Sequence, residues 1–91
     1  MAHLSAKVHG LVQGVNFRYF VWDMAKNLGI TGYVRNLPSG NAIEVEAEGT
    51  KAQLEKLVAQ LKIGPPRAQV KEVKTNWSDY SGQFTNFGMR Y

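Results

Sequence analysis

The sequence contains no cysteine among its 91 residues. Without thiols, the chain cannot form disulfide bonds, bind a metal through thiolates or use a cysteine nucleophile. The cysteine-dependent phosphatases are therefore excluded as a class. Aspartate is also scarce, because only Asp23 and Asp79 are present, and no pair of acids is spaced to hold magnesium.

Long apolar runs and two common hydrolase motifs are missing as well. No segment approaches the roughly 18 apolar residues that cross a membrane, and the opening MAHLSAKVHG has no continuous apolar stretch of the kind found in signal peptides. We therefore expect a cytoplasmic protein with no membrane partner. Neither a G-x-x-x-x-G-K-[ST] phosphate loop nor a G-x-S-x-G serine elbow occurs.

The two histidines are poorly placed for metal binding. His3 and His9 lie on one predicted strand, roughly 20 Å apart at about 3.3 Å per residue, which is too far to share a metal ion. We expect both side chains to face solvent. The sequence predicts no metal site and no cofactor.

The residues that are present fit a single globular domain over residues 1–91. Hydrophobic residues make up 44% of the chain and charged residues 20%, unlike the composition of disordered chains. The net charge of +4 favours an anionic partner, either a nucleic acid, a membrane surface or a small phosphate. Charge alone does not choose among these.

Hydropathy alternates in five segments and repeats with a helical period in two. Strands are predicted over residues 4–12, 30–36, 43–49, 68–77 and 84–91, and helices over 19–28 and from the Thr50–Gln53 capping box to GPP at 64–66. A shift in apolar parity predicts a bulge near Lys71 and Glu72.

The glutamates of the third strand alternate with apolar residues. Ile43, Val45 and Ala47 are predicted to face the core. We expect the alternating acids to form a solvated strand face; they are Glu44, Glu46 and Glu48.

This element order is β-α-β-β-α-β with one short final strand. It predicts an α+β, ferredoxin-like α/β sandwich, with two helices on one face of an antiparallel sheet. Each helix is a crossover, so the first and second strands run in the same direction. Their ends, and the loops that follow them, are therefore expected at one edge of the sheet.

The first of these loops, QGVNFR at residues 13–18, joins a strand to the start of a helix. Gly14 can adopt positive φ, and a tight loop at a helix N-terminus can direct several N–H groups towards one anion. Arg18 would add a charged fork suited to phosphate oxygens. Spacing alone is equally compatible with an ordinary turn that carries a solvated arginine.

The second strand ends in Arg35 and Asn36. The Asn36 amide could orient a water molecule and contact a ligand oxygen, although asparagine is also common in turns. By alternation, Arg35 is expected on the opposite face as a surface charge.

Several of these motifs together resemble the acylphosphatase family. They are GLVQGVNFR, GITGYVRNLPSG, VEAEG, GPPRAQV and the F-x-x-F-x-x-R-Y ending, which together extend over nearly the whole chain. The resemblance implies a ferredoxin-like enzyme that hydrolyses the carboxyl-phosphate bond of small acyl phosphates without metal or cofactor.

The resemblance also implies roles for particular residues. Arg18 would bind the phosphate together with the N–H groups of the loop, and Asn36 would position the attacking water. The implied phosphate-binding loop comprises Gln13, Gly14, Val15, Asn16, Phe17 and Arg18. Asn16 and Ser39 depart from the usual family residues, and the 38–42 hairpin is longer than usual.

The expected partners are an acyl phosphate substrate and inorganic phosphate. Inorganic phosphate is the product and is also expected to inhibit the enzyme. We expect the enzyme to be a monomer. One alternative is a basic ferredoxin-like module that binds nucleic acid, but the K/R-G-F/Y-G/A-F-V-x-F/Y run typical of RNA-binding sheets is absent. A second alternative is a catalytically silent domain with the same fold.

Overall fold

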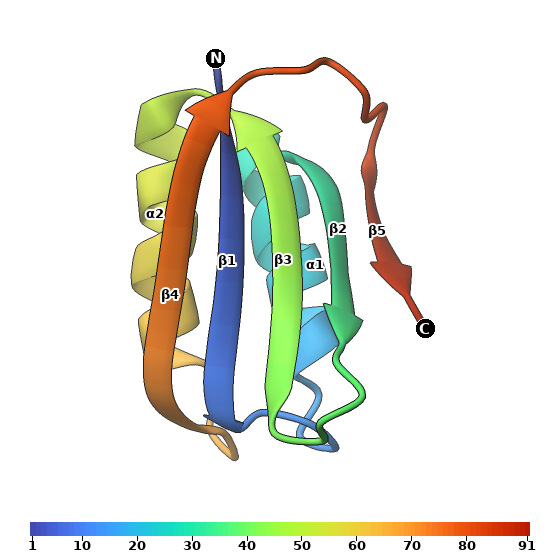
Figure 1. Cartoon of the computed structure of the whole chain (residues 1–91), viewed down its shortest axis with the longest axis vertical. Coiled ribbons are helices and arrows are strands. Elements are labelled where there is room, and N and C mark those ends of the chain that lie inside the picture. The colour runs from blue at the N-terminus through green and yellow to red at the C-terminus, as the bar shows by residue number, and fades with distance from the viewer.

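The computed structural model describes all 91 residues and has the predicted order of elements (Figure 1). They are β1 (Ala2–Leu11), α1 (Phe17–Leu28), β2 (Thr31–Asn36), β3 (Ala42–Gly49), α2 (Lys51–Ile63), β4 (Gln69–Asp79) and β5 (Phe87–Arg90). Both helices cover the same face of one sheet, as in a ferredoxin-like α/β sandwich.

The five strands lie in the order β4-β1-β3-β2-β5. The first four strands pair antiparallel, as predicted, but β5 pairs parallel with β2, so the complete sheet is mixed. The direction of β5 follows from the chain path. After β4 the chain turns back along the top of the sheet to the opposite edge, so β5 runs against β4 and therefore with β1 and β2 (Figure 1).

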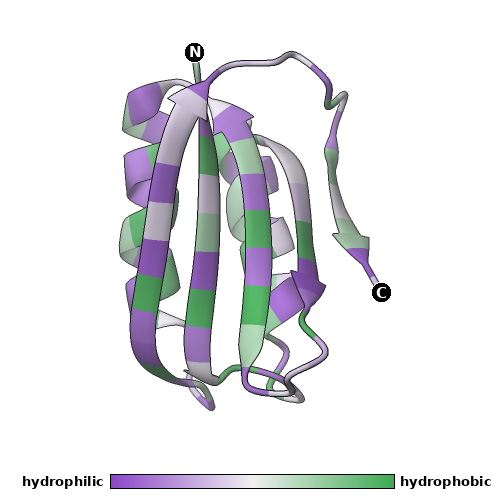
Figure 2. Cartoon of the chain, in the orientation of Figure 1, coloured by the Kyte–Doolittle hydropathy of each residue, from purple (hydrophilic) through white to green (hydrophobic).

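The core lies between the sheet and the helices. Alternate residues of each strand point into it, and Figure 2 shows this alternation of hydrophobic and hydrophilic positions along the central strands. The inward positions of β3 are those predicted from the sequence. The core comprises Leu4, Ala6, Val8, Val12, Phe17, Val21, Ala25, Ile30, Val34, Ile43, Val45, Ala47, Leu54, Leu57, Leu61 and Phe87.

The predicted bulge in β4 is confirmed. His9 pairs with Glu72 but Gly10 pairs with Val70, so Lys71 has no partner on β1. Gly10 permits this close approach, because a Cβ there would lie 2.1 Å from the carbonyl oxygen of Gln69.

The residues at the start of each helix explain where the helix begins. α2 begins with the predicted capping box, in which Thr50 and Gln53 each accept a hydrogen bond from the other's backbone N–H. α1 begins at Phe17, two residues earlier than predicted, because the buried Phe17 ring already belongs to the helical face that packs on the sheet.

The open face of the sheet differs from the prediction at its upper end. The glutamates were expected to be solvated and His3 to face solvent, but Glu48 is 1% exposed and His3 8% exposed. The segment between β4 and β5 covers them, with the Phe84 ring stacked 6.2 Å from the His3 ring. Alternation correctly gave the face of each residue, but it could not indicate that a distant segment covers that face.

Glu48 is buried with a complete set of hydrogen-bond donors. Its carboxylate accepts from the Ser81 N–H and hydroxyl at 2.8 and 2.7 Å, from the Gly82 N–H at 3.0 Å and from His3 Nδ1 at 2.7 Å. Burial alone would raise the pKa of Glu48, but these donors outweigh it and lower the pKa to about 2.

His3 bridges two carboxylates on β3. Nδ1 contacts Glu48 and Nε2 contacts Glu46, each at 2.7 Å. Burial lowers the pKa of His3, but the hydrogen bonds and charges of Glu46 and Glu48 outweigh it, so the pKa lies above the ordinary 6.5. We call His3, Glu46, Glu48 and Ser81 the upper clasp.

Replacing Glu48 by glutamine should lower the free energy of unfolding by about 2 to 4 kcal/mol, because it leaves charge-assisted donors poorly matched. Glu48 contributes fully above its ordinary pKa of 4.5, and its contribution falls as pH drops towards about 2. His3 contributes fully below pH 6.5 and its contribution is lost as pH rises through its raised pKa.

Denaturant unfolding from pH 2 to 9 measures the difference in the free energy of unfolding between wild type and Glu48→Gln. This difference should be largest between about pH 4.5 and 6.5 and should become smaller at lower and at higher pH. Glu55→Gln, on the exposed side of α2, is the matched control. A difference in the free energy of unfolding that stays constant from pH 2 to 9 would contradict the proposal that Glu48 and His3 are charged in the upper clasp.

Candidate active site

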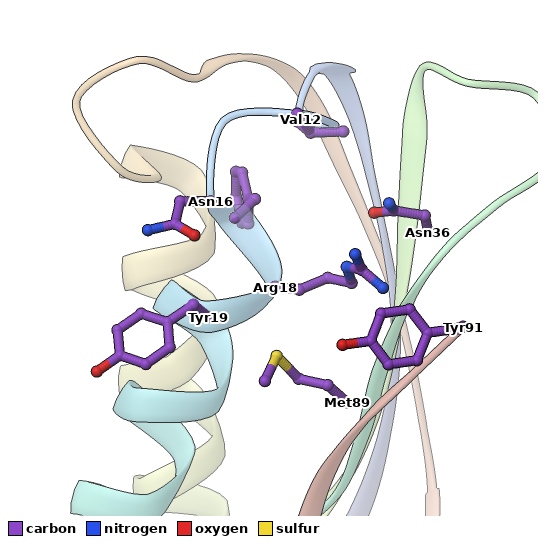
Figure 3. Close-up of a pocket in the computed structure, with 9 residues that line it drawn as sticks. Val12, Asn16, Arg18, Tyr19, Asn36, Met89 and Tyr91 are labelled. Atoms are coloured by element: carbon purple, nitrogen blue, oxygen red, sulfur yellow. The ribbon is translucent and has the colours of Figure 1, made fainter.

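A pocket of about 630 Å³ opens at the edge of the sheet where β1 and β2 end. Three segments form its walls: the loop from β1 into α1, the end of β2 and the end of the chain after β5. Figure 3 shows the Arg18 side chain extending across it towards Asn36 and Tyr91. The lining residues are Val12, Gly14, Asn16, Phe17, Arg18, Tyr19, Asn36, Met89 and Tyr91.

The loop leading into α1 has unpaired backbone donors. Gly14 and Asn16 have φ values of 73° and 67°, in the left-handed region, which asparagine tolerates better than most residues. No N–H of residues 14–18 donates a backbone hydrogen bond outside the regular elements, and the first helical bond is donated by Phe20 to Asn16. The loop therefore presents free donors next to a helix N-terminus, an arrangement that suits an anion.

Arg18 is positioned by two neutral groups from the end of the chain. Nη1 donates to the Arg90 carbonyl oxygen at 3.2 Å, and Cζ lies 4.4 Å from the centroid of the Tyr91 ring. No carboxylate lies within 4.0 Å of the guanidinium, since all four ion pairs of the protein involve other residues. Its positive charge is therefore uncompensated and available to an anionic ligand.

Asn36 ends β2 on the opposite wall, and its amide is directed towards the same space (Figure 3). That amide makes no hydrogen bond to another protein group. Arg35 faces the other side of the sheet, as predicted, where its Nε donates to Glu44 at 2.8 Å. Arg35 is therefore part of an ion pair on the open face and is not part of the pocket.

Two residues of the predicted loop do not line the pocket. The Gln13 side chain turns away and Nε2 donates to the carbonyl oxygens of Leu37 and Ala42, each at 2.8 Å. Val15 packs partly against the core. Gln13 thus ties the loop that carries Arg18 to the hairpin that follows Asn36.

Four lining residues were not predicted: Val12, Tyr19, Met89 and Tyr91. Tyr91, at the end of the predicted last strand, is 94% exposed and lies over Arg18. The signal that could have located it is strand direction, since a last strand parallel to β2 must end at the edge where β2 ends.

No group of three or more histidine, cysteine, aspartate or glutamate side chains is placed to hold a metal ion. Neither helix is long and apolar enough to cross a membrane.

Comparison with known proteins identifies the family. The acylphosphatase family model matches residues 4–89. An acylphosphatase of Dehalococcoides mccartyi is 46% identical over 97% of both chains, and one of Pasteurella multocida is 46% identical over 92% of both chains. The crystal structure of acylphosphatase from Bacillus subtilis superposes with a TM-score of 0.95, at 33% identity over the full length of both chains.

A fold of this kind, with free donors and an unpaired arginine at one sheet edge, defines a small anion-binding α/β sandwich. The comparisons make the assignment specific: the chain belongs to the acylphosphatase family. It is an enzyme that hydrolyses acyl phosphates to a carboxylate and inorganic phosphate. The family assignment supports the catalytic interpretation of the sequence.

Replacing Gln13 by alanine removes the two hydrogen bonds that tie the loop between β1 and α1 to the β2–β3 hairpin. We expect the free energy of unfolding to fall by about 1 to 3 kcal/mol and kcat to fall as Arg18 and Asn36 lose their relative position. Chemical denaturation and steady-state hydrolysis measure the two effects. Gln69→Ala, at an exposed position of β4, is the control, and equal stability of the two variants would show that the tie contributes nothing.

Proposed function

We propose that the phosphoryl group of the acyl phosphate binds to the N–H groups of the Gln13–Arg18 loop and to the Arg18 guanidinium. Asn36 then holds a water molecule in line with the bond from phosphorus to the carboxyl oxygen. The observation that supports this most strongly is the pocket itself, in which free backbone donors, an uncompensated cation and a free amide face one space.

The reaction needs little proton transfer. The water oxygen forms a new bond to phosphorus, the bond from phosphorus to the carboxyl oxygen breaks, and its electron pair leaves with the carboxylate. The water proton passes to a phosphoryl oxygen or to solvent. Because a carboxylate is a weakly basic leaving group, positioning and charge stabilisation can supply most of the catalysis without a general base or a metal ion.

The same site should bind the product. Inorganic phosphate presents the same oxygens to the loop and to Arg18, so we propose that it inhibits competitively. We also propose that the enzyme is cytoplasmic and has no nucleic acid partner. We propose that it acts as a monomer, because one chain supplies every residue of the proposed site.

Replacing Arg18 by alanine should lower kcat/KM for acetyl and benzoyl phosphate by several orders of magnitude. One lost donor accounts for about 10² to 10³ of this, and the lost charge for the rest. Lys56→Ala, on the exposed side of α2, removes the same charge elsewhere and should retain activity. Wild-type hydrolysis by Arg18→Ala would exclude the proposed phosphate clamp.

Replacing Asn36 by alanine should lower kcat by about 10² or more while the inhibition constant of phosphate changes little, because the water and not the phosphate loses its partner. Steady-state kinetics with phosphate as competitor separate the two effects, with Asn27→Ala on α1 as control. Loss of phosphate binding together with normal turnover at saturating substrate would contradict the proposed role.

A further inference from the structure

The proposed mechanism restricts where the acyl group can lie. In an in-line displacement, the attacking water and the leaving oxygen are on opposite sides of phosphorus. Asn36, which holds the water, lies on one side of the Arg18 guanidinium, and Asn16 and Tyr19 lie on the other (Figure 3). With phosphorus bound beside the Arg18 guanidinium, the acyl group would point towards Asn16 and Tyr19.

A second pocket, of about 430 Å³, begins at those two residues. Asn16 and Tyr19 line both pockets, so together they form the ridge between them. Beyond the ridge, the second pocket lies between the start of α1 and the turn that follows α2, which contributes Pro65 and Pro66. A ligand that extends from the phosphoryl site over the ridge enters this pocket.

We infer that the second pocket is the acyl subsite, and that it favours acyl phosphates with an apolar acyl group, either aromatic or a chain of several carbons. This inference rests on the proposed in-line mechanism. Aromatic rings and prolines form much of its wall. Its lining residues include Val15, Tyr19, Phe20, Pro65 and Pro66.

These apolar groups are held in place before a ligand arrives. Tyr19 is half exposed but stacks on Trp22 with 5.7 Å between ring centroids, and Phe20 packs edge-on against the buried Phe17 at 5.8 Å. Proline rings have no side-chain freedom to lose. A preformed apolar wall binds an apolar group at little entropic cost.

The charges at this pocket do not favour an ionic acyl group. Asp23 and Arg67 line it with opposite signs, and neither takes part in an ion pair within the chain. A carboxylate on the acyl group would be attracted by Arg67 but repelled by Asp23. The two opposite charges therefore give an acidic acyl group no net attraction at this pocket.

The test is a substrate series of acetyl, butyryl, hexanoyl and benzoyl phosphate. We expect kcat/KM to rise roughly tenfold from acetyl to hexanoyl or benzoyl phosphate, mainly through KM, because the apolar contact exists in both ground and transition states. Tyr19→Ala and Pro66→Asp should each remove most of this rise. Tyr80→Ala is the matched control, since Tyr80 is similarly exposed, at 46% against 50% for Tyr19, but lies after β4 at the other end of the sheet.

Two kinds of result would overturn the inference. One is equal kcat/KM along the series, or a rise that survives in both Tyr19→Ala and Pro66→Asp. The other is a preference for succinyl phosphate that disappears in Arg67→Gln, which would show recognition of charge instead. Activity of Arg18→Ala or Asn36→Ala on acetyl phosphate tests the proposed mechanism separately, so failure of the subsite is distinguishable from failure of the mechanism.

Discussion

The candidate active site depends on the pairing of β3 with two neighbouring strands. β1 and β2 each pair antiparallel with β3, so they run in the same direction although they are not neighbours in the sheet. The loop after β1 and the last residue of β2 therefore meet at one edge of the sheet. Arg18 and Asn36 are separated along the sequence, and only this shared strand brings their side chains to one pocket.

The charges of the protein are arranged so that Arg18 remains available. On the open face, Arg35 is paired with Glu44, and His3 lies between Glu46 and Glu48. These carboxylates lie on the face opposite the helices and none reaches the pocket. Arg18 instead contacts a carbonyl oxygen and an aromatic ring, which orient a guanidinium without neutralising it.

The sequence predicted those features that local pattern determines. Alternation and helical spacing gave the order of elements, the apolar parity of β4 gave the bulge at Lys71, and the crossover rule brought Arg18 and Asn36 to one edge. Each of these inferences needs only neighbouring residues and the handedness of the chain.

The prediction was incomplete where a segment distant in the sequence determines whether a side chain is buried. The sequence indicated that His3 and Glu48 face away from the helices, but not that residues 80–86 cover them. The same segment carries the chain to the far edge, which makes β5 parallel to β2 and brings Tyr91 over Arg18. Both errors therefore have one physical origin, the path of the chain after β4.

That path connects the upper clasp with the active site at the other end of the sheet. Glu48 holds Ser81 and Gly82 where the chain leaves β4, and Phe84 packs against both His3 and Tyr33 as it crosses towards β5. β5 then pairs with β2 and ends with the carbonyl oxygen that accepts from Arg18. The residues after β5 thus form the third wall of the pocket, and the upper clasp anchors the start of the path that brings the Arg90 carbonyl oxygen to Arg18.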